Sequence, residues 1–397
     1  MIEIFLTIFF ITVLLFFLGS GIWVAVSMIG VSAIGMMLFT SRPVGDAMAT
    51  TIWGTSSSWT LTALPLFVWM GEILFRTKLS ENLFKGLSPW MQKLPGGLIH
   101  VNVVGCALFA AISGSSAATV ATVGKMSIPE LRKRNYPEKI LLGSLAGSGT
   151  LGLLIPPSII LIIYGVAVQE SIAKLFIAGI IPGIMIALIF MSYVVIWSLI
   201  NKKDMPKIIE EFSFLEKIKR SRQLLPVILL ILGVIGSIYT GIATATEAAS
   251  LGVVGALILS YFQKSLTLDT FKSSLLGATK TSCMIAFILA GSTFLSLAMG
   301  FTGLPRNLAI WIQNMDLSPY VLIFVLMIFY IILGMFLDGI SAVVLTMAII
   351  EPMIRQAGFD MIWFGIFLVI VVEMAQITPP VGFNLFVLQG MANKDMG

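Results

Sequence analysis

The chain has 397 residues, of which 58% are hydrophobic and 11% charged, and its mean hydropathy is +1.03. This composition excludes an ordinary soluble domain, because a soluble core needs far less apolar surface, and long continuous apolar runs favour membrane helices over the alternating strands of a barrel. The net charge of +5 does not predict nucleic-acid binding, since basic loops beside a membrane account for it.

Three apolar segments near the start of the chain predict membrane helices. Ile4–Leu18 and Ile22–Phe39 are separated by the turn residues Gly19–Gly21. Leu61–Phe75 follows after a more polar stretch and contains one carboxylate, Glu72.

The stretch Leu83–Leu94 differs from these segments because it is too short to cross a bilayer. Its apolar residues share one helical face, which predicts a helix lying in the membrane interface. A short connector on the soluble side is the alternative. The apolar face consists of Phe84, Leu87, Trp90, Met91 and Leu94.

Two short apolar limbs follow, Leu98–Ile112 and Ala117–Ile128, with the small polar residues Ser113–Ser116 between them. Each limb has fewer than the ~20 residues that a membrane span needs. The pattern predicts a re-entrant hairpin, which enters the membrane and returns to the same side. The alternative for the serines is that small residues allow close helix packing.

The apolar run Ile140–Val166 carries Pro156 and Pro157. Proline lacks a backbone N–H and its ring clashes with a carbonyl one turn earlier, so a regular helix cannot pass through this pair. In a membrane the freed carbonyls need other partners, which they find inside the protein or beside a polar cavity. The run therefore predicts a broken helix at a functional site, and a kinked packing helix is the alternative.

A long span, Leu175–Ile200, is followed by the clearest linker, residues 201–222, with seven basic and four acidic residues. Lys125–Lys139, after the hairpin, is also basic. Basic loops stay in the cytoplasm, so we expect both segments there. The linker divides the chain into a first repeat, 1–200, and a second repeat, 223–397.

The second repeat shows the same order of elements as the first. They are the spans Leu224–Tyr239, Thr246–Phe262 and Leu275–Met299, an amphipathic stripe over Leu308–Met315, a hairpin around 338–341 with limbs Val321–Leu337 and Ala342–Met353, and a broken helix over 362–388. Ser116 precedes Pro156 by 40 residues, and Ser341 precedes Pro379 by 38. Two copies of one unusual pattern predict an internal repeat, which is how secondary transporters build a binding site at the bilayer midplane.

The loops after the two hairpins differ in charge. Lys125–Lys139 has five basic residues, whereas its counterpart Glu351–Asp360 has only Arg355. The two hairpins should therefore open to opposite sides of the membrane, which makes the repeats inverted.

Hydroxyls and freed backbone carbonyls at these elements suit Na⁺, while Mg²⁺ or Ca²⁺ would ask for carboxylates, which the first hairpin lacks. Helix N-termini at the hairpin tips suit an anionic substrate. The sequence contains no HExxH, GxSxG or Walker A motif, so we expect a protein that is not an enzyme.

Carboxylates inside membrane segments are functional candidates by default. Asp338, at the second hairpin, is the strongest, while Glu247 can equally serve as a helix cap. The weaker polar candidates are Glu72, Glu373, Gln376 and Asn384, the last of which faces either a cavity or a packing contact.

Six segments also carry a specific resemblance. They are Pro65–Glu72, Ser113–Gly124, Met126–Leu131, Gly149–Ser158, Thr246–Ala249 and Thr378–Phe386. Together they closely resemble the large, DctM-like membrane subunit of tripartite ATP-independent periplasmic (TRAP) transporters, and the resemblance covers essentially the whole chain.

The resemblance implies Na⁺-driven import of an organic acid, a C4-dicarboxylate or similar carboxylate, across the bacterial inner membrane. It implies an elevator movement, in which the hairpins and broken helices travel against a fixed scaffold. It also implies two partners, a small four-helix membrane subunit and a periplasmic substrate-binding protein that delivers the ligand.

Site residues follow from the same motifs. The resemblance places one Na⁺ among Ser113, Ser116, Gly152, Ile155 and Pro156. It assigns Gly339, Ala375 and Thr378 to a second Na⁺. It places Ser115, Asp338, Ser341 and Asn384 nearest the substrate.

The resemblance and the internal symmetry both call for one more span after the second broken helix. We therefore expect that the sequence is truncated or that another chain fills that place. Two other functions fit the sequence, namely a stand-alone Na⁺/dicarboxylate carrier with similar hairpins and a membrane scaffold or receptor without flux.

Overall fold

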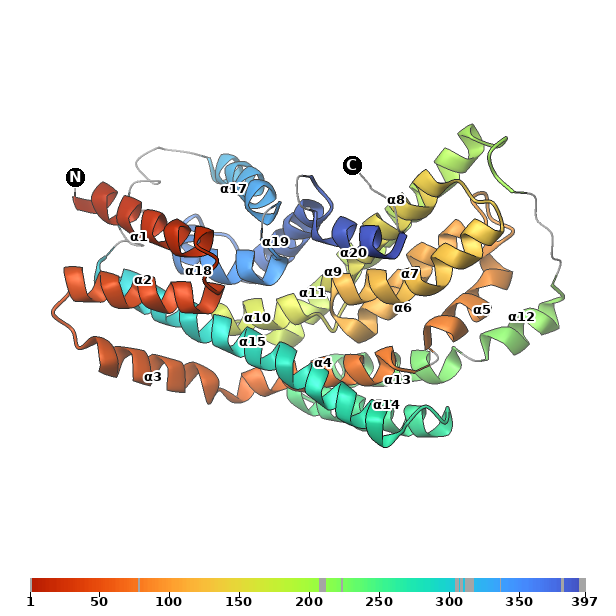
Figure 1. Cartoon of the computed structure of the whole chain (residues 1–397), viewed down its shortest axis with the longest axis horizontal. Helices are drawn as coiled ribbons and strands as arrows, with labels where there is room; N and C mark the ends of the chain where they lie inside the picture. The colour runs from red at the N-terminus through yellow and green to blue at the C-terminus, as the bar shows by residue number, and fades with distance from the viewer. Residues whose placement is uncertain are drawn as a thin grey trace.

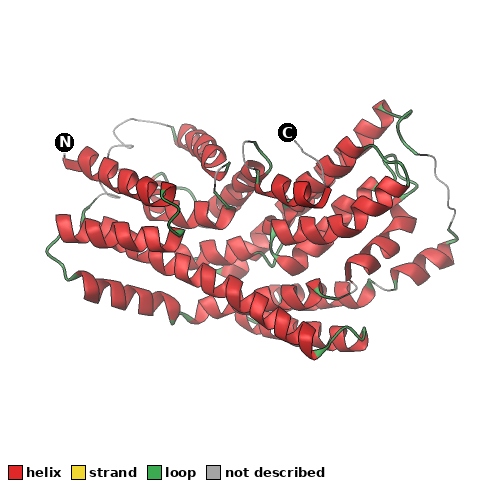
Figure 2. Ribbon diagram, in the orientation of Figure 1, coloured by secondary structure: helices red, strands yellow, loops and turns green. Residues whose placement is uncertain are grey.

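The computed structural model describes the chain apart from residues 1, 78, 207–211, 223, 304–306, 308–309, 311–317, 336, 380–381 and 393–397. In this described part every regular element is a helix (Figure 2). By length and composition four helices can cross a membrane, and up to seven spans result if each bent helix pair counts as one. The chain is therefore a multi-pass membrane protein, as its hydropathy predicts.

The linker residues divide the helices into two sets in chain order. Up to residue 200 they are α1 (Ile2–Gly19), α2 (Val24–Phe39), α3 (Val44–Ser56), α4 (Ala63–Phe75), α5 (Leu79–Met91), α6 (Ile99–Ser113), α7 (Ser116–Lys133), α8 (Glu138–Gly149), α9 (Leu151–Leu154), α10 (Ile159–Ala167) and α11 (Ile172–Ile200). After it they are α12 (Phe214–Ser221), α13 (Leu225–Tyr239), α14 (Ala245–Phe262), α15 (Leu268–Phe301), α17 (Pro319–Gly334), α18 (Gly339–Gln356), α19 (Met361–Gln376) and α20 (Phe383–Ala392).

The helices form two groups that meet along the long helix α15 and also through the contacts of α4 with α6 and α10 (Figure 1). The first, which we call the α2–α4 group, contains α2, α3, α4, α13 and α14. The second, which we call the hairpin group, contains α6–α10 and α17–α20. α15 lies along α2, α3 and α4 and also contacts α18, where the buried Ser292 hydroxyl donates a 2.6 Å hydrogen bond to the Val344 carbonyl.

Both predicted helix breaks are present. The first run is divided into α8, α9 and α10, with a bend of 40° at the break. α9 ends at Leu154, and the Ser158 hydroxyl then caps α10 by accepting the N–H of Leu161 at 3.3 Å. The second run is divided into α19 and α20, and Pro380, in the break between them, lies outside the described residues.

The amphipathic stretch predicted over Leu83–Leu94 belongs to α5, which packs against α12 of the basic linker. The Trp90 indole donates a 2.7 Å hydrogen bond to the Ser221 hydroxyl, and the Lys217 ammonium lies 5.4 Å from the centre of the same indole. Part of the linker is thus a helix attached to α5. Of the second stripe, Leu308–Met315, only Ile310 lies within the described residues.

Two helices differ from the sequence-based expectations. α3 was not predicted, because its sequence mixes polar with apolar residues and none of its side chains is buried. α15 begins at Leu268, seven residues before the expected span, because Thr267 and Thr270 form a cap at the start of the helix. The apolar run alone does not reveal this polar first turn.

We predict that the contact between α15 and α2 depends on Gly291. A Cβ atom at Gly291 would lie 2.8 Å from the Ala25 carbonyl oxygen, which is part of the α2 backbone and cannot easily move. Gly291→Ala should therefore destabilise the fold by about 1–3 kcal/mol and lower the apparent melting temperature in detergent.

The matched control is Gly300→Ala on the same helix, where an added Cβ would meet nothing within 4 Å. This variant should melt at or slightly above the wild-type temperature, since alanine favours helix more than glycine does. Equal melting temperatures for the two variants would contradict the close packing of α15 on α2.

Candidate functional site

The first hairpin turns at Gly114 and Ser115. Gly114 ends α6 in the left-handed conformation, with φ of +59°, and its N–H donates to the Ala110 carbonyl at 3.1 Å. Ser115 then caps α7, and its hydroxyl accepts the N–H of Ala118 at 3.5 Å. Glycine adopts this conformation without steric cost, so the chain can reverse in two residues.

The hairpin tip lies directly against the first helix break. The N–H of Ile159, at the start of α10, donates a 3.3 Å hydrogen bond to the Gly114 carbonyl. A Cβ atom at Gly152 would lie 2.6 Å from the Ser115 carbonyl oxygen, and one at Gly114 would lie 2.8 Å from the Pro157 carbonyl oxygen. The tip and the broken helix therefore touch through their backbones, and glycine is needed on both sides of the contact.

Polar groups collect where these backbones meet. The Ser113 hydroxyl lies 2.9 Å from the Thr119 hydroxyl, which itself donates to the Ser115 carbonyl at 2.8 Å. Ser116 is buried, and its hydroxyl has no partner among the described residues. A buried hydroxyl without a hydrogen-bond partner lowers the stability of the fold, so we expect a bound group to contact the Ser116 hydroxyl.

Of the other predicted first-site residues, Ile155 follows the last residue of α9, and Pro156 is buried within the break. Their carbonyls lie where the helical hydrogen-bond pattern stops. The structure therefore brings the hairpin tip and the break into one place, as the motifs predict.

The second hairpin meets its break in a similar way. The Asp338 carboxylate caps α18 by accepting the N–H of Ser341 at 3.1 Å. A Cβ atom at Gly339 would lie 2.6 Å from the Gln376 side-chain nitrogen, at the end of α19. Ala375 is buried beside this contact, and Thr378 is half-buried, with its hydroxyl donating to the Met374 carbonyl at 2.6 Å.

Both hairpin tips line one cavity of about 1380 Å³. Ser113 and Ser115 reach it from the first tip, and Asp338 and Ser341 reach it from the second. Most of the remaining lining is apolar, which is typical of small-molecule sites with a few polar groups that fix the ligand. Three of the four predicted substrate residues therefore face a common space.

Asn384 is the exception. It is fully buried on α20, it does not line this cavity, and neither polar atom of its amide has a partner among the described residues. Its neighbour Phe383 does line the cavity. The structure thus separates Asn384 from Ser115, Asp338 and Ser341.

The two broken helices are joined by Glu373. Its buried carboxylate accepts the N–H of Leu153 at 3.2 Å and also that of Leu154, in the last turn of α9. Glu373 lies two residues before Ala375, so a single side chain of α19 connects the second break to the first. The sequence marked Glu373 only as a weak candidate, because the partner lies 220 residues away in the chain.

Two further carboxylates have structural partners. Glu247 and Thr244 form a capping box at the start of α14, in which the Thr244 N–H donates to the Glu247 carboxylate at 2.8 Å. Glu72 lines the cavity but forms an ion pair with Arg76, one turn further along α4. Capping, the alternative for Glu247, is therefore the role that its contacts support.

Sequence analysis missed Lys280, which lines the cavity from α15. It lies inside the span predicted over Leu275–Met299, and a basic residue in such a position is itself a signal for function. The lysine is visible in the sequence. Because small and hydroxyl residues surround it, the segment resembles an ordinary membrane span.

This arrangement of helices and cavity is that of a multi-pass membrane protein with an internal site. The fold is similar to a solved structure, the YdaH transporter of Alcanivorax borkumensis, with a TM-score of 0.65 at 12% sequence identity, over 94% of this chain and 90% of that chain. At this identity the likeness concerns the fold alone.

Comparison of the sequence with protein families is more specific than the likeness of the fold. Residues 10–397 match the model of the tripartite ATP-independent periplasmic transporter DctM component, and the chain belongs to this family. It is 34% identical over 366 residues to the C4-dicarboxylate TRAP transporter large permease protein DctM of Pseudomonas aeruginosa, covering 92% of this chain and 85% of that protein. It is 30% identical to the isethionate TRAP transporter permease protein DctMQ of Oleidesulfovibrio alaskensis, covering 95% of this chain and 59% of that protein.

We predict that the two cysteines differ sharply in reactivity. Cys283 is exposed and lines the cavity, whereas Cys106 is buried within α6. A charged, water-soluble methanethiosulfonate should therefore modify Cys283 in the folded protein and leave Cys106 unmodified, as read by intact-protein mass spectrometry.

Cys283→Ser should show no modification under the same conditions, and Cys106→Ala should behave like the wild type. Modification of Cys106 at a rate similar to that of Cys283 would contradict the burial of α6 behind the cavity.

Proposed function

We propose that this chain is the transporting subunit of a Na⁺-coupled importer of an organic acid. The observation that carries the proposal is the cavity lined by both hairpin tips, with Ser113, Ser115, Asp338 and Ser341 in its wall. Each tip also lies against a helix break, where backbone carbonyls leave the helical pattern. The proposed substrate groups and the proposed cation ligands would thus be adjacent, which supports coupling between them.

The proposed first Na⁺ site lies among Ser113, Ser116, Gly152, Ile155 and Pro156. Support comes from the buried hydroxyl of Ser116, which lacks a partner among the described residues. Gly152 allows the tip to approach closely, so that hydroxyl and carbonyl oxygens converge. Neutral oxygens of this kind suit a monovalent cation.

The proposed second Na⁺ site lies among Gly339, Ala375 and Thr378. Support comes from the contact of Gly339 with the end of α19, which repeats the tip-to-break contact of the first site. The Thr378 hydroxyl donates its hydrogen to the Met374 carbonyl, so its oxygen lone pairs stay available to a cation. We propose that Asn384, which does not line the cavity, affects substrate binding indirectly and does not contact the substrate.

The substrate is proposed to be a C4-dicarboxylate or a similar organic anion. The names of the two relatives give C4-dicarboxylate for the Pseudomonas protein and isethionate for the Oleidesulfovibrio protein, and both are small organic anions. The N-termini of α7 and α18, at the two tips, are favourable ends for negative charge.

The proposed partners are a small four-helix membrane subunit and a periplasmic binding protein, in the bacterial inner membrane. The family name is that of a tripartite periplasmic transporter, and the name of one relative joins an M with a Q component in one chain. No nucleic acid is part of the proposed function.

The proposed movement is an elevator, with two inverted repeats, 1–200 and 223–397, joined by the basic linker 201–222. The hairpin group is the proposed moving part and the α2–α4 group is the proposed scaffold, with α5 braced in the membrane interface. Support comes from the division of the helices into these groups and from the matching hairpins.

The energy available fits this scheme. Each Na⁺ that crosses a membrane potential of 100 mV contributes about 2.3 kcal/mol. Two would contribute about 4.6 kcal/mol, or somewhat over a thousandfold accumulation at about 1.4 kcal/mol for each factor of ten. A Na⁺ gradient adds to this, and the inward movement of an anion subtracts from it.

We predict that uptake requires Na⁺ and fails when either site is filled. Ser116→Leu and Thr378→Leu each replace a hydroxyl by a bulky apolar group, and each should reduce Na⁺-driven uptake at least tenfold. Uptake is measured in proteoliposomes that contain this chain and the small subunit, with ligand-loaded binding protein outside. A Na⁺ gradient is compared with a proton gradient at a fixed membrane potential.

The control is Ser192→Leu on the exposed face of α11, which makes the same chemical change away from the cavity and should keep uptake. Full uptake without Na⁺ would contradict the coupling. Uptake that needs no binding protein would instead favour a stand-alone carrier, and the absence of counterflow would favour a scaffold without flux.

A further inference from the structure

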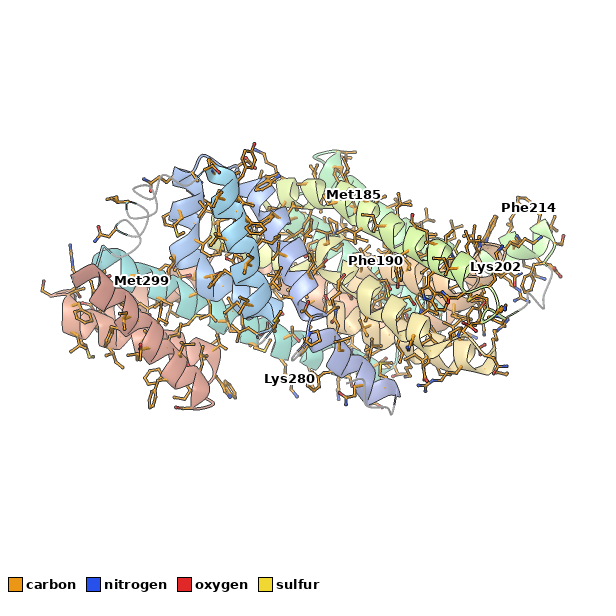
Figure 3. The ribbon with its side chains drawn as sticks, turned by 90° about the horizontal axis from the view of Figure 1, so that it is seen from above. Met185, Phe190, Lys202, Phe214, Lys280 and Met299 are labelled. Atoms are coloured by element: carbon orange, nitrogen blue, oxygen red, sulfur yellow. The ribbon has the colours of Figure 1, made fainter. Side chains whose placement is uncertain are left out.

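α15 carries a lysine well inside a long membrane helix. Lys280 is the thirteenth of 34 residues, so at 1.5 Å per residue it lies ~18 Å from the start of the helix and ~32 Å from its end. The helix is longer than the ~30 Å hydrocarbon core, and the part after Lys280 is long enough to span it, so Lys280 lies near one edge of the apolar part of α15. A lysine in this position is stabilised when it faces water or an opposite charge. Lys280 lines the cavity and is exposed, and Figure 3 shows it at the edge of the molecule.

One carboxylate lies close to Lys280, because a Cβ atom at Gly277, one turn earlier on α15, would lie 2.7 Å from a carboxylate oxygen of Glu72. Among the described lining residues, the charged ones are Glu72, Lys280 and Asp338. Glu72 is paired with Arg76, and Asp338 accepts the N–H of Ser341 at the N-terminus of α18. No ion pair in the described part of the chain includes Lys280.

Lys280 also differs from the other polar lining residues in its position. The serines and Asp338 belong to the two hairpin tips, while α15 packs along the α2–α4 group. The cavity is thus bounded by neutral and acidic groups on the hairpin side and by one ammonium on α15. An anion in the cavity would find its only strong positive side chain, among the described lining residues, at Lys280.

We propose that Lys280 binds the anionic group of the transported acid, while the hairpin tips hold the rest of the molecule. An ammonium is a compact charge with three rotatable donors, so it accepts a carboxylate or a sulfonate without demanding the planar geometry that arginine prefers. This inference rests on the proposed function for the identity of the ligand, but the charge of the cavity can be measured independently.

The independent test uses Cys283, which lies one turn from Lys280 and lines the same cavity. In a Cys106→Ala background, the rate of Cys283 modification is measured with a sulfonate reagent, MTSES, and with a trimethylammonium reagent, MTSET. Side chains one helical turn apart are about 5–6 Å from each other. The positive charge of Lys280 should therefore raise the MTSES rate about threefold and lower the MTSET rate about threefold.

Lys280→Gln should therefore lower the ratio of the MTSES rate to the MTSET rate about tenfold. Lys280→Arg should keep the ratio, because the charge is retained. Lys272→Gln, on the same helix but outside the cavity lining, removes an equal charge and should leave the ratio unchanged. Equal ratios in Lys280→Gln and wild type would overturn the proposal.

The second measurement is Na⁺-driven uptake of radiolabelled succinate in proteoliposomes with the partner subunits. Lys280→Gln should raise KM at least tenfold with kcat changed less than twofold, and Lys280→Arg should restore most of the affinity. An unchanged KM would overturn the role in substrate binding. If wild-type protein takes up no succinate, the proposed substrate is wrong, while the ratio of labelling rates still decides whether Lys280 attracts anions into the cavity.

Discussion

The structure depends on one constraint, which is that backbone groups released by a helix break must find partners away from water. At the first break the Ile159 N–H donates to the Gly114 carbonyl of the hairpin tip. Just before the break, the Glu373 carboxylate accepts the N–H groups of Leu153 and Leu154, of which the Leu153 N–H also donates to the Thr150 carbonyl. An unpaired buried amide costs about 1–3 kcal/mol, so each of these contacts favours one arrangement of the chain. The need to pair buried backbone groups therefore holds the hairpins, the breaks and α19 in place, and it also brings polar groups into the site.

The two tip-to-break contacts use glycine in complementary ways. In the first, Gly152 lies on the broken helix and meets the backbone of Ser115. In the second, Gly339 lies on the hairpin and meets the side chain of Gln376. In both contacts glycine has no side chain, so the two chain segments can approach closely. The hydroxyls and carbonyls of the hairpin tips then lie near the cavity. Glu373 then connects α19 to α9 through its carboxylate, beside the direct contacts of α9 and α10 with α19.

Much of this could be predicted from the sequence, because proline pairs, glycines and short apolar limbs act locally. The hairpin at Ser113–Ser116 and the break at Pro156 are visible in a few adjacent residues, and the structure contains both. What could not be predicted depends on contacts between distant segments. The link from Glu373 to Leu153, the separation of Asn384 from the other substrate candidates, and the exposed helix α3 have no local signature. Lys280 is different, because its signal was local but was hidden by the mixed composition of α15.

The hydrogen bond from Ser292 to Val344 has a mechanical consequence. It joins α15 to α18, and any sliding of the hairpin group past α15 has to break it. A bond of this kind contributes about 0.5–1.5 kcal/mol, which is less than one Na⁺ delivers at 100 mV. In the proposed elevator movement, this hydrogen bond would hold α18 at one position on α15 and would break when the hairpin group slides.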